Sequence, residues 1–269
     1  RTLPREPGLP KTVAAATAWQ TGRRKRLAEI VKFKKQGVQA EVVAEATLAG
    51  ARSTHWKLSL DGQWTVPVVE LNRARAPEGT VVLLGDAGRS SLTPQAEKLL
   101  SENRRVLLVD PFYFGEAKVA PQRDYLWALL ISAVGDRPLG VQSSQIAAVA
   151  RWLATERQSG PVRVTAYGPR TSLVAVVAAA LEETAIGALE LHDPLVSLKE
   201  VITQNRSVEQ TPELFCFGLL EWFDAMQIAA LVAPRPIEAP QALERLSEAD
   251  RTALVEFFDI LEDAAEGKE

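Results

Sequence analysis

The spacing of hydrophobic residues changes near residue 80, and the two parts of the chain predict different elements. Residues 13–33 place apolar side chains at helical intervals, which predicts a helix. Two short alternating runs follow at 56–60 and 65–71, and the Asp61-Gly62 step between them is typical of a β-hairpin. The first part is therefore expected to form a helix and then an antiparallel hairpin.

After residue 80, short apolar runs alternate with helical patterns. Runs of the length expected for buried parallel strands lie at 81–84, 106–109, 162–167 and 188–191, with a late edge strand at 231–237. Helices are predicted over 93–101, 141–157 and 172–183, with further helices beginning at Ser197 and Ser247 and a partly helical insertion at 112–139. The alternation predicts an α/β fold, in which a mostly parallel sheet follows the N-terminal hairpin and helices cover both faces. We assign residues 1–50 to a linker and N-terminal helix, and residues 51–269 to the α/β domain.

The composition is that of an ordinary globular domain, with 46% hydrophobic and 24% charged residues among 269. A net charge of −3 gives no reason to expect nucleic acid as a partner, and no apolar run is long enough to span a bilayer. Cys216 is the only cysteine, which excludes an internal disulfide. No metal-ligand cluster or phosphate-binding glycine motif is present, so neither a metal nor a cofactor is predicted. The proline-rich start at 1–10 does not have the pattern of a signal peptide and is expected to be a linker; a processed end and a segment of a longer protein both fit it.

Residues that could bind a ligand or take part in a reaction follow several predicted strands. In parallel sheets, functional sites lie at the carboxyl ends of the strands. One strand end leads into a small loop, 85–90, that could direct a backbone N–H at a developing oxyanion. Two others lead into 110–116 and 166–172, and Asp193 follows a fourth strand. The resulting candidates for a cleft are Asp86, Gly88, Arg89, Asp110, Glu116, Arg170, Thr171 and Asp193.

The segment 166–172 has the spacing of a nucleophile elbow. Such an elbow needs a small residue two positions before the nucleophile and another two positions after it, because the turn is tight. Gly168 and Ser172 fulfil this requirement, and Arg170 lies between them. A guanidinium has no lone pair with which to attack and stays protonated. The elbow is therefore interpreted as degenerate, and no catalytic residue is assigned.

The chain offers no evident general base. An acyl-transfer triad on this frame would place an acid and then a histidine after the nucleophile, with the histidine normally following the last strand. His192 is the one histidine after Arg170, and residues 194–269 contain none. We expect His192 to be structural or solvent-facing, and His55 to be a surface or packing residue.

Other nucleophiles have plainer explanations. Capping of loops and helices accounts for four hydroxyls, those of Ser90, Ser91, Ser143 and Ser144. Cys216 lies in an apolar run that would raise its pKa and make it inert. The aspartates at the strand ends have two possible roles. One of them could act as a nucleophile, or its carboxylate could instead be bound by Arg170.

Six segments, at 86–89, 110–116, 135–140, 197–200, 212–220 and 230–236, carry a family resemblance. They resemble the α/β-hydrolase domains of bacterial acetyl-xylan-esterase-like proteins, and more specifically the second, degenerate domain of tandem proteins of that kind. In active relatives, the strand ending in Pro-Arg-Pro leads to a loop with the acid, then to a strand and the catalytic histidine. Here the chain passes from Ile237 through 238–240 directly to the last helix. The resemblance thus implies an α/β-hydrolase fold with a truncated C-terminal part, a preceding catalytic hydrolase domain in the same polypeptide, and a periplasmic or secreted location.

Arg170 at the start of a helix indicates a positive site, because helix N-termini and arginine forks both favour anions. One hypothesis is that the cleft binds a carboxylate, sulfate or sugar acid without turning it over. The alternative, which we favour, is that the acids at neighbouring strand ends neutralise Arg170, because a buried charge must be paired; these acids are Asp86, Asp110, Glu116 and Asp193.

Three functions of different classes remain open. The one that we favour is a non-catalytic domain auxiliary to an attached or partner carbohydrate esterase. The second is an active carboxylester hydrolase acting on acylated carbohydrates. The third is an anion or sugar-acid binding module that uses the degenerate cleft.

Overall fold

The computed structural model describes residues 8–48, 50–73, 76–118 and 125–267. Within these residues, eight strands form one sheet in the order β1-β2-β3-β5-β4-β6-β7-β8. Their bounds are β1 Val38–Leu48, β2 Ala51–Leu60, β3 Trp64–Arg73, β4 Thr80–Gly85, β5 Arg105–Val109, β6 Val162–Tyr167, β7 Ile186–His192 and β8 Ile237–Glu238. Neighbouring strands from β1 to β5 along this order are antiparallel, and the pairs from β5 to β8 are parallel.

Helices connect and cover these strands. The longer ones are α1 Val13–Val31, α2 Thr93–Ser101, α3 Tyr125–Ala133, α4 Pro138–Thr155, α5 Pro169–Leu181 and α10 Glu248–Ala265. The shorter ones are α6 Glu200–Thr203, α7 Leu219–Trp222, α8 Ala225–Ala230 and α9 Pro240–Arg245, with 3₁₀ turns η1 Arg89–Leu92, η2 Gly115–Ala117 and η3 Pro212–Leu214.

The predicted N-terminal helix and hairpin are confirmed as α1, β2 and β3. Asp61 and Gly62 form the hairpin turn with φ of 49° and 68°, the left-handed conformation that Asp-Gly favours. The sequence did not predict β1, whose side chains are mostly exposed and include many alanines. β1 pairs with β2 along its length, so the division at residue 50 falls in the turn between two paired strands. Residues 1–7 of the predicted linker lie outside the described residues.

In the second part, the predicted parallel strands and main helices are confirmed, with two exceptions. The late strand predicted at 231–237 is wrong, because only Ile237 and Glu238 pair with β7 and the residues before them form turns. Pro234 and Pro236 have no N–H to donate to a ladder, which explains the short pairing. The helix predicted from Ser197 is reduced to the four residues of α6.

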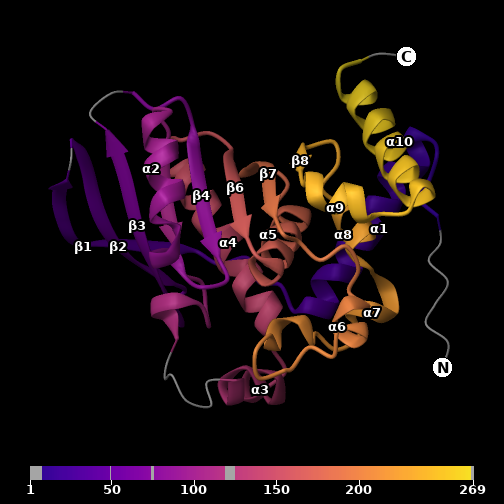
Figure 1. Cartoon of the computed structure of the whole chain (residues 1–269), viewed down its shortest axis with the longest axis horizontal. Helices are drawn as coiled ribbons and strands as arrows, with labels where there is room; N and C mark the ends of the chain where they lie inside the picture. The colour runs from indigo at the N-terminus through magenta and orange to yellow at the C-terminus, as the bar shows by residue number, and fades with distance from the viewer. Residues whose placement is uncertain (1–7, 49, 74–75, 119–124, 268–269) are drawn as a thin grey trace.

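The two faces of the sheet are covered differently. α1, α4 and α5 pack on one face and form the main core with it, whereas α2 covers β4 and β5 on the other face. Figure 1 shows α2 in front of the sheet, α4 and α5 behind it, and no helix in front of β6, β7 and β8. The last helix, α10, packs on α1 and α8 instead.

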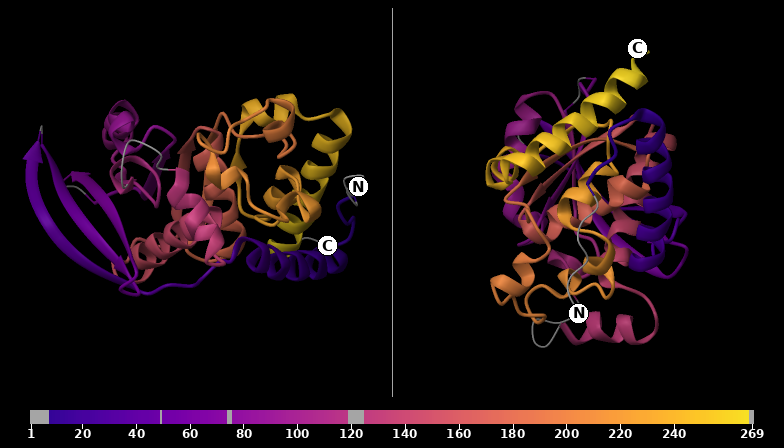
Figure 2. Two further views of the ribbon diagram at one scale, coloured as in Figure 1. Left: turned by 90° about the horizontal axis from the view of Figure 1, so that it is seen from below. Right: turned by 90° about the vertical axis from the view of Figure 1, so that its right-hand side faces the viewer.

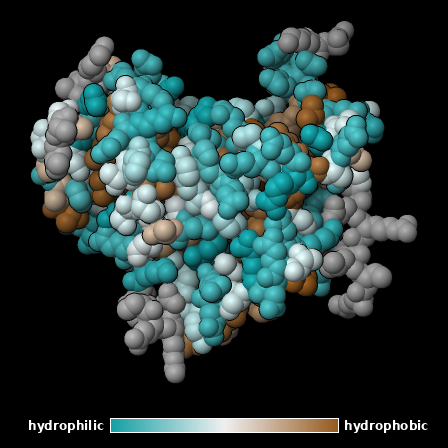
Figure 3. Space-filling view, viewed as in Figure 1, coloured by the Kyte–Doolittle hydropathy of each residue, from teal (hydrophilic) through white to brown (hydrophobic). Residues whose placement is uncertain are grey.

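The uncovered face of β6, β7 and β8 is polar. Side chains from alternate positions point to it: Arg163, Thr165, Tyr167, Glu190, His192 and Glu238. The same side of the molecule is largely hydrophilic in the space-filling view (Figure 3). A buried parallel strand is usually apolar on both sides, so this alternation fits a sheet face that meets solvent.

β1, β2 and β3 extend beyond the helices as a curved arm (Figure 2). The arm remains attached to the body because β3 pairs with β5 and because Trp56 on β2 packs edge-to-face on Trp152 of α4, with ring centroids 5.3 Å apart. Aromatic pairs of this geometry contribute about 0.5–1.5 kcal/mol beyond the area that they bury.

Candidate functional site

The predicted elbow lies at a sharp corner between β6 and α5. β6 ends at Tyr167, Gly168 takes a φ of 109°, and α5 begins at Pro169, whose missing N–H costs nothing in the first turn. A Cβ on Gly168 would collide with the carboxylate of Asp86, so the corner requires glycine. Arg170 therefore occupies the corner position that the spacing predicted.

The side chain of Arg170 is buried and paired with a glutamate. Its Nε donates to Oε1 of Glu213 at 2.5 Å and its Nη2 donates to Oε2 at 3.0 Å, which makes a bidentate pair. Arg170 is 8% exposed and Glu213 is fully buried. The guanidinium carbon also lies 4.4 Å from the ring centre of Phe114, so an aromatic face covers the cation.

This pairing fixes the charge of Arg170. Burial acts to lower the pKa of its guanidinium, but the hydrogen bonds and charge of Glu213, together with the charge of Asp86, raise the pKa above its ordinary value. Arg170 therefore stays protonated and its fork is occupied from within the protein. The acids proposed as its partners from the sequence did not include Glu213; of those four, Asp86 contacts only the backbone N–H of Arg170, at 3.2 Å.

Asp86 caps the first turn of α5. Its Oδ1 accepts from the backbone N–H and from the hydroxyl of Thr171, both at 2.8 Å. In an elbow of this type, the N–H of the residue after the nucleophile serves an oxyanion. Here a carboxylate of the protein itself occupies that donor, so the helix N-terminus already holds an anion.

The remaining candidates at the ends of β4 and β5 form a second cluster around Asp110. The buried Asp110 accepts from the backbone N–H of Arg89 at 2.8 Å and from that of Glu116 at 2.9 Å. The Arg89 side chain is ion-paired with Glu116 and lies 3.5 Å from Asp110. Gly88 and Gly115 pass so close to each other that a Cβ on Gly88 would clash with the backbone of Gly115. Asp110 therefore holds two loops together.

The histidines and Asp193 lie away from this cluster. His192 stacks on Tyr167 with ring centroids 4.2 Å apart, and its Nε2 lies 3.0 Å from Oε1 of Glu190. Tyr167 packs with the α2 side of the sheet, opposite α5, so the His192 ring faces away from Arg170. His55 is exposed on β2. Asp193 is exposed beyond β7, where its backbone N–H donates to Gln241.

Three of the four serines that were predicted to be inert, and Cys216, have local explanations. Ser91 donates to the carbonyl of Gly88 at 2.7 Å, Ser143 donates to that of Val174 at 3.2 Å, and Ser144 accepts from the N–H of Lys34 at 2.9 Å. Burial raises the pKa of the Cys216 thiol to about 12, although the charge of Arg137 acts to lower this pKa. These groups therefore contribute to structure.

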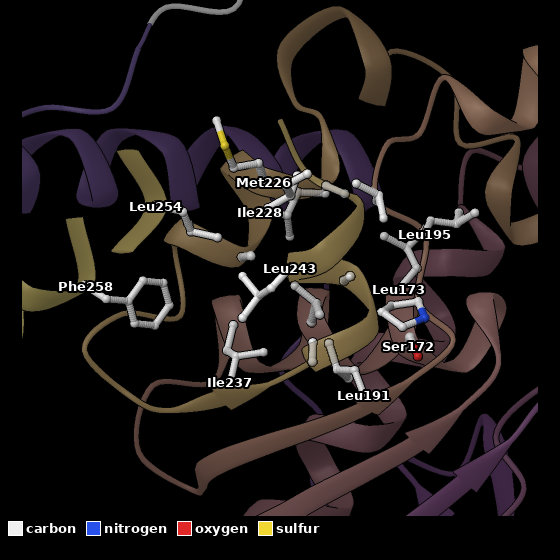
Figure 4. Close-up of a pocket in the computed structure, with 18 of the residues that line it drawn as sticks. Ser172, Leu173, Leu191, Leu195, Met226, Ile228, Ile237, Leu243, Leu254 and Phe258 are labelled. Carbon is white, nitrogen blue, oxygen red and sulfur yellow. The ribbon is translucent and has the colours of Figure 1, made fainter. Parts of the chain in front are cut away.

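An apolar pocket lies beside the elbow helix, between α5, α8, α9 and α10 (Figure 4). Its volume is about 310 Å³, and its walls are mainly aliphatic. Ser172 and Leu195 lie at one end and Phe258 at the other. Among the described residues that line it, Asp259 is the one titratable side chain, and it is exposed. The pocket can hold apolar groups, but it brings no acid–base pair together.

The described part of the chain contains neither a candidate metal site nor a candidate membrane-spanning helix. No cluster of histidine, cysteine or carboxylate side chains there could hold a metal ion. No helix there is long and apolar enough to cross a bilayer.

Comparison with solved structures identifies the fold. A putative acetyl xylan esterase from Bacteroides fragilis matches 97% of this chain and 77% of its own, with a TM-score of 0.75 and 17% identity. The chain has an α/β-hydrolase fold. Acetyl xylan esterase 1 from Thermoanaerobacterium sp. matches 80% of this chain and 75% of its own, with a TM-score of 0.58 and 10% identity. A methylesterase matches 95% of this chain but 59% of its own, with a TM-score of 0.64 and 14% identity. No family model matches the chain, and no curated protein matches it.

Within this α/β-hydrolase fold, the residue that sequence reasoning missed is Glu213. It is an isolated acid in the apolar run 211–217. Glutamate is almost never fully buried without a partner, so an acid in such a run signals a buried cation elsewhere. That signal was available, but it does not say which arginine is the partner.

Proposed function

We propose that this α/β-hydrolase chain is a non-catalytic domain, auxiliary to a carbohydrate esterase that is attached to it or bound by it. The observation that carries the proposal is the buried pair of Arg170 and Glu213 at the corner between β6 and α5. A guanidinium locked by two hydrogen bonds cannot attack a carbonyl carbon.

Ester hydrolysis by this fold needs a nucleophile, a base and donors for the oxyanion. Arg170 fills the position of the nucleophile, and Asp86 engages the N–H of Thr171. His192 faces the opposite side of the sheet, and His55 lies on the arm. Each requirement is therefore unmet for a separate physical reason, and this argues against the alternative of an active carboxylester hydrolase.

The class of the partner is inferred from similarity. Two structural neighbours are named as acetyl xylan esterases, and a third is named as a methylesterase. The polar, uncovered face of β6, β7 and β8 suits contact with another folded domain, because interfaces between domains are more polar than cores.

The catalytic part of the proposal is tested with p-nitrophenyl acetate and the purified chain. We expect the rate to equal that of the Arg170→Ala variant and of buffer alone. Turnover that rises with protein concentration and is lost in Arg170→Ala or His192→Ala would overturn the proposal and restore the active hydrolase.

The auxiliary part is tested on the coding sequence that precedes Arg1. We expect a serine-containing elbow followed, later in that sequence, by an acid and a histidine. We also expect the melting temperature of that hydrolase to rise when it is produced together with this chain. A hydrolase with the same melting temperature and activity with and without this chain would count against an auxiliary role.

The third function, an anion site in the degenerate cleft, is not favoured. Nε and Nη2 of Arg170 both donate to Glu213, and Asp86 already caps the N-terminus of α5. A second carboxylate there would have to displace one that the fold supplies.

A further inference from the structure

A separate polar pocket lies on the arm, where β1, β2 and β3 pass the C-terminal end of α4. Its volume is about 270 Å³. Its lining includes Trp56 and Thr54 of β2, Glu70 of β3 and Arg157, which follows α4. It shares no lining residue with the apolar pocket beside α5.

A β-bulge in β1 shapes one wall of this pocket. The register shifts between Val42 and Ala44, so that Val42 lies opposite Trp56 and Glu45 lies opposite Thr54. Without the extra residue, strict alternation would place Ala44 on this face instead of Glu45. The bulge thus brings a carboxylate to the rim, where it pairs with Arg52 of β2.

Glu70 organises the cations of the pocket. It is 5% exposed, and it accepts from Nε of Arg105 at 2.7 Å and from Nε1 of Trp56 at 2.9 Å. Nη2 of Arg157 reaches both of its oxygens at 3.4 Å, which is a long contact. Both oxygens of Glu70 therefore already accept hydrogen bonds. The Arg157 guanidinium, 38% exposed, lies over the rings of Trp56 and Trp152, 5.0 and 5.9 Å from their centres, so among the described residues its N–H groups are engaged only by the long contacts with Glu70.

The cluster has more positive charge than negative charge. Two arginines, at 52 and 157, and two glutamates, at 45 and 70, line the pocket, and Arg105, which does not line it, adds a third arginine through its pair with Glu70. Nη2 of Arg105 is buried and has no hydrogen-bond partner among the described residues. Arg105 does not line the pocket, so the fork of Arg157, whose contacts with Glu70 are long, is the donor that an acceptor from outside the chain can reach.

Neutral polar groups complete the lining. Thr54 has a hydroxyl and Asn72 has an amide, and no side-chain hydrogen bond of either is found within the described ranges. Trp56 adds an aromatic surface beside them. Hydroxyl and amide groups next to an aromatic ring suit a ligand that carries several hydroxyls, and the arginine excess suits one negative charge.

We propose that this arm pocket binds a monoanionic sugar acid, with the carboxylate on Arg157 and the hydroxyls of the ring on Thr54 and Asn72. This site is independent of the degenerate elbow and of the proposed function. It is proposed as a binding site only.

The test is calorimetric titration of the whole chain with glucuronate, with glucose and acetate as matched ligands. We expect millimolar binding of glucuronate, and binding of glucose or acetate at least about tenfold weaker, because charged hydrogen bonds and the ring contacts each contribute. Equal affinity for glucose would overturn the role of the charge, and equal affinity for acetate would overturn the role of the ring. An absence of heat with glucuronate at millimolar concentration would overturn the site.

Substitutions test which residues bind glucuronate. Arg157→Gln should weaken glucuronate binding about tenfold or more, whereas Arg163→Gln should leave it unchanged. Arg163 is a matched control because its exposure is nearly the same, 37% against 38%, and it also pairs with glutamates, but it lies on the polar face of β6. Asn72→Ala, at a half-buried position, provides a second variant that does not disturb the charges and should weaken binding several-fold. Unchanged binding in both Arg157→Gln and Asn72→Ala would refute the proposal.

Discussion

The buried pair at the elbow leads to a quantitative prediction for Glu213→Gln. The substitution keeps the shape of the side chain but removes its charge, so the guanidinium of Arg170 stays buried without a counterion. Breaking a buried ion pair by removing one partner costs about 3–5 kcal/mol. Because Arg170 is 8% exposed and Glu213 is fully buried, solvent screening reduces this value little. For a domain of this size, the loss lowers the melting temperature by about 6–20 °C.

The assay is urea unfolding followed by tryptophan fluorescence, together with a thermal scan. Glu209→Gln is the matched control, because Glu209 is exposed and a surface change of this kind alters stability by about 0.5 kcal/mol or less. A double variant, Arg170→Met with Glu213→Leu, should recover most of the loss, since well-packed apolar residues replace buried ion pairs at little cost. The reasoning is refuted if Glu213→Gln unfolds within about 1 kcal/mol of the unmodified chain, or if the double variant is no more stable than the single one.

Three further predictions concern stability and reactivity. Cys216, whose pKa burial raises to about 12, should not react with a thiol reagent at neutral pH until urea unfolds the chain; fast labelling of the folded chain would contradict this. Burial acts to raise the pKa of Glu70, but Arg105, Trp56 and Arg157 lower this pKa overall. Ionised Glu70 therefore stabilises the fold above about pH 4.3, and this stabilisation is lost as the pH falls through the pKa of the folded state. The stability difference between the unmodified chain and Glu70→Gln should therefore shrink in acid, and a difference that does not change with pH would disprove the assignment. Gly115→Ala should lower the free energy of unfolding in urea by about 2 kcal/mol or more, because its Cβ would strike the carboxylate of Asp110. Gly135→Ala, also at positive φ but in open space, should lower it less. Equal losses would argue against the role of Asp110 in holding the two loops together.

Local sequence patterns predicted most of the architecture. The Asp61-Gly62 turn, the apolar runs of β4, β5, β6 and β7 and the serine cap of α10 all depend on residues that are close in sequence. β1 was missed because its side chains are mostly exposed, and hydrophobic periodicity is weak in a strand that buries little. The late strand was overpredicted because an apolar composition does not show whether the proline-interrupted backbone can pair.

The sequence by itself determined the spacing that predicts an elbow and the identity of its central residue. Gly168, Arg170 and Ser172 lie within five positions, and the proposal that a nucleophile is missing there depends on side-chain chemistry alone. Only the tertiary structure decided what neutralises Arg170, because Glu213 lies 43 residues away and reaches it from a separate 3₁₀ turn. The same holds for the arm pocket, whose two lining arginines come from β2 and from the segment just after α4. Hydrophobic spacing fixes which face of an element is buried, whereas the pairing of distant charges depends on how those elements pack, and no local pattern records it.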